Sequence, residues 1–251
     1  MRYLLSDKRI LVTGANGGIG LSICETFLKN HSKLVLFYNK KRTDVDDLLK
    51  RHEDLRSSVE IHQIDLLDNL KLEHLMPKIL ESGKIDAFVH SVTLPVENKS
   101  VMDMRWEDYK SHIEIQTRSF VQIVQSLIPS MKERKFGKII SILTSYTVGR
   151  PPNKISSYIV GKYSLLGLTK SLAVELGPFG ITVNSISPSM TNTPLTEKLP
   201  SKFKEITINQ IPLGRLAEPI DVAQTALFLC SKYSDYISGE NFLVTGGQTM
   251  H

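Results

Sequence analysis

The stretch Thr13-Gly14-Ala15-Asn16-Gly17-Gly18-Ile19-Gly20 decides how this sequence is interpreted. It follows the β-branched, apolar run Arg9–Thr13 and leads into the apolar-periodic run Ile19–Leu28, so it predicts a turn between a strand and a helix. Glycines there permit a tight turn and the close approach of a pyrophosphate to the N–H groups of the helix. The spacing is G-x-x-x-G-x-G, which differs from the general G-x-G-x-x-G dinucleotide fingerprint. A simple helix cap is the alternative.

Short β-rich runs alternate with longer helical ones along the rest of the chain, which is the pattern of a parallel sheet with crossover helices. Residues 1–251 are therefore predicted to form a single-domain Rossmann-type doubly wound α/β fold, with helices on both faces. The predicted strands are Arg9–Thr13, Lys33–Tyr38, Val59–Ile64, Ala87–His90, Lys138–Leu143, Ile181–Ser187 and Asn241–Val244. The clearest further helices are Leu70–Glu81, Gln116–Lys135, Ser157–Leu176 and Pro219–Leu229. The weakly patterned residues 189–213 are long enough to form a lid over a site.

Composition excludes several classes of protein. With 41% hydrophobic and 23% charged residues, the chain has ordinary globular usage, which argues against disorder. A net charge of +5 suits an anionic ligand but falls short of the basic face of a nucleic-acid binder. Cys24 and Cys230 stand far apart and indicate neither a disulfide framework nor a metal site. No signal peptide or membrane-length apolar run is recognisable, so we expect a cytoplasmic protein without membrane contact.

Tyr158-Ile159-Val160-Gly161-Lys162 has the pattern Y-x-x-x-K inside a predicted helix. This spacing puts the phenol and the ammonium group one turn apart on the same face. A phenol of pKa about 10 is a poor acid–base at neutral pH, but a nearby ammonium and a positively charged nicotinamide lower that pKa. Tyr158 can then exchange a proton with a carbonyl or alcohol oxygen. Alone, the pattern also describes an ordinary amphipathic pair.

The glycine turn and the Y-x-x-x-K pair resemble those of the short-chain dehydrogenase/reductase family, and the resemblance covers essentially the whole chain. Further matching segments are Ser164–Leu176, Gly180–Asn184, Ile186–Pro188, Pro212–Arg215, Ile237–Gly239 and Gly246–Gly247. Within the family, the chain is most similar to the 3-oxoacyl-carrier-protein reductase type. The resemblance implies an oxidoreductase that interconverts a ketone and a secondary alcohol by hydride transfer with a nicotinamide cofactor, and a homo-oligomer, either a tetramer or a dimer.

The end of the second strand bears on the choice of coenzyme. An acidic residue there would favour NAD, whereas Lys40, Lys41 and Arg42 favour NADP(H) over NAD(H), unless they form only a solvated turn. Gly17 argues against NADP, because NADP-dependent relatives often have a basic residue there. The resemblance implies that Asp65 lies by the adenine amino group, although a helix cap is its alternative. The implied cofactor-binding residues are Gly14, Asn16, Gly18, Ile19, Gly20, Lys40, Lys41, Arg42, Asp65, Leu66, His90, Ser91, Tyr158, Lys162, Pro188 and Thr193.

The sequence departs from the family pattern at three places. The N-N-A-G segment after the fourth strand is His90-Ser91-Val92-Thr93, and we interpret His90 as a packing residue. The asparagine that supports a water relay to the lysine falls, by spacing, on Gln116. The usual Pro-Gly after the sixth strand is Pro188-Ser189.

Two neighbours compete for the role of the hydroxyl that orients the substrate carbonyl. Counting back from Tyr158 by the usual family interval gives Ser145, whereas counting forward from Gly137 gives Thr144, so one residue has been inserted. An insertion in the loop Tyr146–Ser157 selects Thr144, and a bulge at the strand end selects Ser145. We favour Ser145, because serine is the residue type that the family uses.

Three functional hypotheses remain open at this point. The first is a reductase of the 3-oxoacyl type, in which Lys132, Arg134, Lys135 and Lys138 meet an acidic carrier protein, unless they form only a solvated helix end. The second is a dehydrogenase of a sugar or other small alcohol. The third is a catalytically silent nucleotide-binding module, which the altered Gln116 would permit and the intact Tyr158 argues against.

Overall fold

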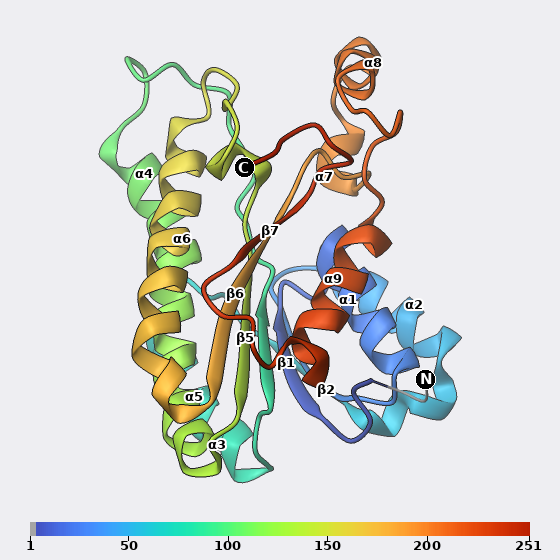
Figure 1. Ribbon diagram of the computed structural model, residues 1–251, viewed down its shortest axis with the longest axis vertical. Coiled ribbons are helices and arrows are strands. Elements are labelled where there is room, and N and C mark those ends of the chain that lie inside the picture. The colour runs from blue at the N-terminus through green and yellow to red at the C-terminus, as the bar shows by residue number, and fades with distance from the viewer. Residues whose placement is uncertain (1–3) are drawn as a thin grey trace.

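Seven parallel strands form the centre of the protein, which a computed structural model describes over residues 4–251 (Figure 1). The strand order is β3-β2-β1-β4-β5-β6-β7. The strands are β1 (Arg9–Thr13), β2 (Lys33–Tyr38), β3 (Val59–Gln63), β4 (Ala87–His90), β5 (Gly137–Ile142), β6 (Ile181–Pro188) and β7 (Asn241–Val244). The order reverses between β1 and β4, and doubly wound sheets bind ligands at such a reversal, outside the carboxyl ends of the strands. The predicted fold is confirmed.

Helices cover both faces of the sheet (Figure 1). One face is covered by α1 (Gly18–Lys29), α2 (Thr43–Arg51) and α9 (Pro219–Cys230). The other is covered by α3 (Asn69–Glu81), α5 (Ser119–Arg134) and α6 (Ser156–Leu176), and α4 (Trp106–Ile113) packs along α6. None of the helices among residues 4–251 is both long and apolar enough to cross a membrane.

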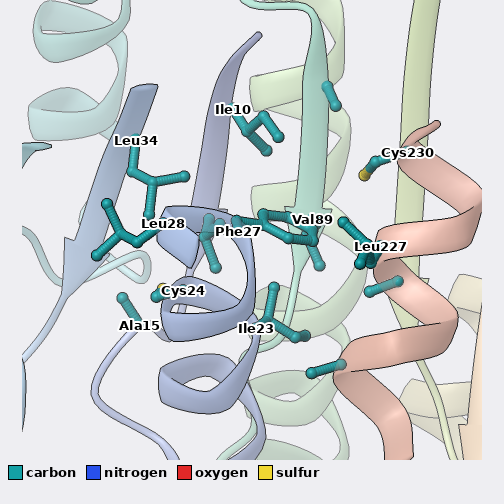
Figure 2. Close-up of a cluster of buried hydrophobic side chains, with 14 of the residues drawn as sticks. Ile10, Ala15, Ile23, Cys24, Phe27, Leu28, Leu34, Val89, Leu227 and Cys230 are labelled. Carbon is teal, nitrogen blue, oxygen red and sulfur yellow. The ribbon is translucent and has the colours of Figure 1, made fainter. Parts of the chain in front are cut away.

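The core between the sheet and the first helix layer holds α1 in place. Figure 2 shows Ile23 and Phe27 of α1 meeting Val89 of β4 and Leu227 of α9. Both cysteines are buried in this layer as free thiols, and burial raises the pKa of Cys230 to about 12. Because α1 is fixed on the sheet, its N-terminus and the glycine turn before it are fixed as well.

The helix predicted from Gln116 begins ten residues earlier than the sequence indicates. It starts as α4, passes through a π-helical turn, η2 (Glu114–Arg118), and continues as α5. The first part has few apolar residues, which weakens the helical periodicity. The sequence pattern also did not predict α2, nor α7 (Pro194–Glu197) and α8 (Ser201–Asn209) within residues 189–213. The side view in Figure 1 shows α8 standing away from the sheet at its carboxyl edge.

Candidate active site

The glycine turn between β1 and α1 forms a shallow cradle. Gly14 has φ +69°, a conformation that favours glycine, and a Cβ there would lie 2.5 Å from the backbone oxygen of Ser91. A Cβ on Gly18 would lie 2.7 Å from Cγ2 of Thr193. The first turn of α1 carries no acidic side chain. The close packing requires glycine at both positions, and the turn suits a pyrophosphate because an acidic side chain at the start of α1 would repel the anion.

The basic residues after β2 are not equivalent. Lys40 and Lys41 are exposed, whereas Arg42 donates to Asp46 at 2.8 Å and directly precedes α2. This ion pair competes with any anion for the guanidinium of Arg42. Lys40 and Lys41 are therefore better placed than Arg42 to bind a phosphate.

The segment after β3 contains Asp65 and Leu66, two of the predicted cofactor-binding residues. Asp65 accepts a hydrogen bond from the backbone N–H of Leu67 at 3.0 Å, while Leu66 is buried. The Asp65 side chain thus stabilises the turn before α3, but it is not the helix cap that its alternative interpretation predicts, because the cap of α3 is Asp68. A contact to adenine stays a prediction.

Lys162 is a buried ammonium group held by two neutral acceptors. Its Nζ donates to Oε1 of Gln116 at 3.0 Å and to the backbone oxygen of Ile142 at 2.8 Å. The residue is 3% exposed, and burial lowers the pKa of Lys162 to about 7. This amine can therefore gain or lose a proton near neutral pH.

Tyr158 lies one turn before Lys162 on α6, as the Y-x-x-x-K spacing predicts. The Nζ atom of Lys162 lies 5.8 Å from the centroid of the Tyr158 ring. Among the protein's own groups, burial raises the pKa of Tyr158 to about 12, and the interaction with Thr144 offsets only part of this effect. The lowering expected beside a positively charged nicotinamide stays a prediction. The phenol is thus protonated, which is the form that can donate a proton, although the raised pKa makes it a weaker acid.

Thr144, rather than Ser145, is the neighbouring hydroxyl whose interaction with the phenol lowers the pKa of Tyr158. The ladder between β5 and β6 runs without a bulge from Gly137 to Ile142, and Leu143 extends it by donating to Ile186 at 2.7 Å. The extra residue therefore lies after the strand. This geometry favours Thr144, because Ser145 already begins the turn η3 (Ser145–Thr147), while the catalytic role of either hydroxyl stays a prediction.

Gln116 connects the lysine to the loop after β4. Its Nε2 donates to the backbone oxygen of Val92 at 3.1 Å, while its Oε1 accepts from Lys162. Val92 in turn packs near the glycine turn, since a Cβ on Gly14 would lie 3.2 Å from Cγ1 of Val92. Gln116 lies in the π-helical turn η2, a distortion that often occurs at functional sites.

Two histidines lie close to this site, although the sequence analysis considered only one. His90 is fully buried, and its Nδ1 lies 3.0 Å from Oγ1 of Thr13. Burial, followed by the charge of Lys162, lowers the pKa of His90 to about 3, so it is neutral and packs as interpreted. The second is His112, four residues before Gln116. That spacing places both on one helix face and could have drawn attention to it.

Pro188 and Thr193 complete the border of the site. Pro188 ends β6, and Thr193 caps α7 and lies against Gly18 of the glycine turn. Residues 189–213 thus begin beside the cradle and continue into α8. The structure therefore brings the glycine turn and the start of the predicted lid together.

Comparison with known proteins identifies the class. Residues 14–249 match the family described as "Enoyl-(Acyl carrier protein) reductase". The 3-oxoacyl-(acyl-carrier-protein) reductase FabG of Thermotoga maritima is 30% identical over 244 residues, which are 97% of this chain and 98% of that protein. The chain belongs to the short-chain dehydrogenase/reductase family, whose members are oxidoreductases that bind nicotinamide cofactors.

Two solved structures share the fold. The gluconate 5-dehydrogenase from Burkholderia cenocepacia, in complex with NADP and tartrate, has a TM-score of 0.89 at 22% identity and covers 98% of this chain and 97% of its own. A 3-oxoacyl-(acyl-carrier-protein) reductase from Brucella melitensis with bound NAD has a TM-score of 0.86 at 24% identity and covers 100% of this chain and 94% of its own.

Proposed function

We propose that this protein is an NADP-dependent oxidoreductase that interconverts a ketone and a secondary alcohol, with 3-oxoacyl thioesters as its first candidate substrates. The group formed by Thr144, Tyr158, Lys162 and Gln116 beside the glycine turn carries the proposal. The bound nicotinamide supplies or accepts the hydride. The intact tyrosine and lysine argue against a silent nucleotide-binding module.

Each residue of this group has a distinct role in the proposal. Thr144 donates to the carbonyl oxygen and aligns it, and Tyr158 transfers its phenolic proton to that oxygen as the alcohol forms. Lys162 stabilises the resulting phenolate, and Gln116 keeps Lys162 in place. In the reverse reaction the same atoms accept the proton. Residues 189–213 form the lid that excludes water from this step.

The choice of coenzyme rests on Lys40 and Lys41. Both are exposed after β2, and the first carboxylate that follows is Asp44. Two ammonium groups would stabilise a 2′-phosphate through charge-assisted hydrogen bonds. Among the structural relatives, one holds NADP and another holds NAD, so the residues of this chain carry the preference for NADP.

Two partners extend the proposal. The Thermotoga relative is named for a substrate on acyl carrier protein, and Lys132 and Lys135 at the end of α5 are candidates to meet such an acidic carrier. The other two predicted residues are engaged, since Lys138 is buried against Asp235 and Arg134 pairs with Asp86. A homo-oligomer, either a tetramer or a dimer, is the assembly that family membership favours.

The second candidate function is a dehydrogenase of a sugar or other small alcohol, favoured by the similarity to gluconate 5-dehydrogenase.

Coenzyme oxidation or reduction with a 3-oxoacyl thioester, a keto sugar acid and a simple ketone separates the two candidate functions. We expect turnover of the thioester with NADPH, and Tyr158→Phe should lower kcat by about 10²–10⁴. Turnover of the sugar acid alone would select the second candidate, and no turnover of any substrate would reject both.

A further inference from the structure

His112 is a buried histidine beside Tyr158 that the reaction proposed above does not use. It lies on α4 and is 6% exposed. Its imidazole meets the Tyr158 ring edge to face, with ring centroids 6.0 Å apart and an interplanar angle of 80°. An edge-to-face contact between buried rings stabilises one relative orientation. His112 therefore restricts the position of the Tyr158 ring from the side of α4.

The close approach of α4 depends on Gly161, which stands between Tyr158 and Lys162 on α6. A Cβ at Gly161 would lie 3.0 Å from the backbone oxygen of His112 and 3.1 Å from its Cβ. Any larger residue would push α4 away from α6. The glycine in the Y-x-x-x-K segment thus places the imidazole directly against the tyrosine and lysine pair.

Charged groups face His112 from three segments. Lys162 faces it from α6, Asp108 lies one turn earlier on α4, and Glu97 lies in the loop before α4. Both carboxylates are shared with Lys99, at 2.6 Å for Glu97 and 3.5 Å for Asp108. Burial and the charge of Lys162 lower the pKa of His112 despite these carboxylates.

The Nδ1 atom of His112 is buried without a hydrogen-bond partner among residues 4–251. A buried imidazolium would therefore leave one N–H donor unsatisfied, which is costly. The neutral imidazole avoids that cost, because burying an unprotonated Nδ1 without a partner costs less free energy than burying an unpaired charge. The surroundings of His112 thus accept the neutral ring and oppose the charged one.

We propose that His112 is a positioning residue for Tyr158 and that protonation of its imidazole stops turnover at acid pH. The inference rests on the proposed function, because it takes Tyr158 as the proton donor. The neutral ring keeps the phenol aligned with the substrate oxygen. The charged ring places a second cation near Lys162 in buried surroundings, and their repulsion moves the imidazole away from Tyr158.

Two substitutions separate the alignment of the Tyr158 ring from the protonation of the His112 imidazole. His112→Phe keeps an aromatic ring but cannot titrate, whereas His112→Ala removes the ring, and His74→Phe on the exposed side of α3 is the matched control. At neutral pH, we expect His112→Ala to lower kcat roughly 10- to 100-fold with coenzyme affinity unchanged. His112→Phe should retain most of the turnover and keep it at acid pH, where the unmutated protein loses it.

Two results would overturn the proposal. One is a kcat for His112→Ala equal to that of the control, and the other is an acid limb of kcat/KM that persists unchanged in His112→Phe. If the alanine variant does not fold, the pH profile of the phenylalanine variant still decides.

A readout without turnover keeps this inference distinct from the proposed function. The imidazole signal that disappears from NMR spectra in His112→Phe identifies His112, and its titration should show a pKa below the ordinary value of 6.5. Lys162→Met should raise that pKa, because it removes the neighbouring charge. If the pKa of His112 is about 6.5 and does not change in Lys162→Met, the role of His112 is rejected even if the enzyme is active. If the pKa of His112 rises in Lys162→Met but the protein turns over no ketone, the proposed function is rejected instead.

Discussion

Lys162 and Gln116 are hydrogen bonded directly, with 3.0 Å between Nζ and Oε1. The family resemblance places an asparagine at position 116, where it supports a water next to the lysine. The longer glutamine reaches the ammonium itself and, through Nε2, also the backbone oxygen of Val92. The departure from the family pattern at Gln116 therefore connects the loop after β4 to the lysine.

Gln116→Leu should impair both activity and stability. It removes the acceptor for Lys162 and the donor for Val92 while retaining most of the side-chain volume. We expect kcat to fall by at least about tenfold through misplacement of Lys162, and the free energy of unfolding to fall by about 1–3 kcal/mol because a buried carbonyl loses its partner. Steady-state kinetics and urea unfolding measure these effects. Gln125→Leu on the exposed side of α5 is the control, and equal behaviour of the two variants would contradict the role of Gln116.

Thr144→Val should be far more harmful than Ser145→Ala. The Thr144 hydroxyl interacts with the Tyr158 phenol, and the loss of one donor to a developing oxyanion typically lowers kcat by about 10²–10³. Valine preserves the shape of threonine, so the difference reports on the hydroxyl. Both variants are compared by kcat with the same substrate. An inactive Ser145→Ala beside an active Thr144→Val would restore the preference that the sequence alone suggested.

Neutralising Lys40 and Lys41 together should remove most of a preference for NADPH. Each charged contact to a 2′-phosphate contributes about 1–3 kcal/mol, whereas Arg42→Ala should have a smaller effect because Arg42 is paired with Asp46. Titration of NADPH and NADH by fluorescence gives both dissociation constants. Lys50→Ala on α2 controls for general loss of positive charge. Equal affinities of the unmutated protein for the two coenzymes would contradict the assignment.

His90 should make the protein less stable as the pH falls. Its pKa is about 3 in the folded protein and 6.5 when unfolded, so below pH 6.5 the unfolded chain binds a proton that the folded one does not. Between these two values, stability should fall by up to about 1.4 kcal/mol per pH unit. Above pH 6.5 this histidine should have no effect.

Urea unfolding at several pH values measures the contribution of His90. His90→Gln should flatten the pH dependence between 6.5 and 3, even if it lowers stability overall, whereas His74→Gln on the surface should not. An unchanged slope in His90→Gln would show that other groups cause the acid sensitivity.

The order of the strands and the two local motifs were determined by the sequence alone. Alternation of β-rich and helical runs predicted all seven strands, because buried parallel strands are apolar on both faces and therefore stand out. The glycine turn and the Y-x-x-x-K pair were also recognisable, because both are local patterns whose geometry follows from one turn or one helix.

The tertiary structure alone decided which atoms meet. Whether Thr144 or Ser145 meets Tyr158 depends on where one extra residue is accommodated, and only the unbroken ladder between β5 and β6 places that residue after the strand. The pKa values of Tyr158 and Lys162 depend on how deeply they are buried, which no local pattern encodes. His112 reaches Tyr158 only because α4 packs on α6, a contact between segments more than forty residues apart in the chain.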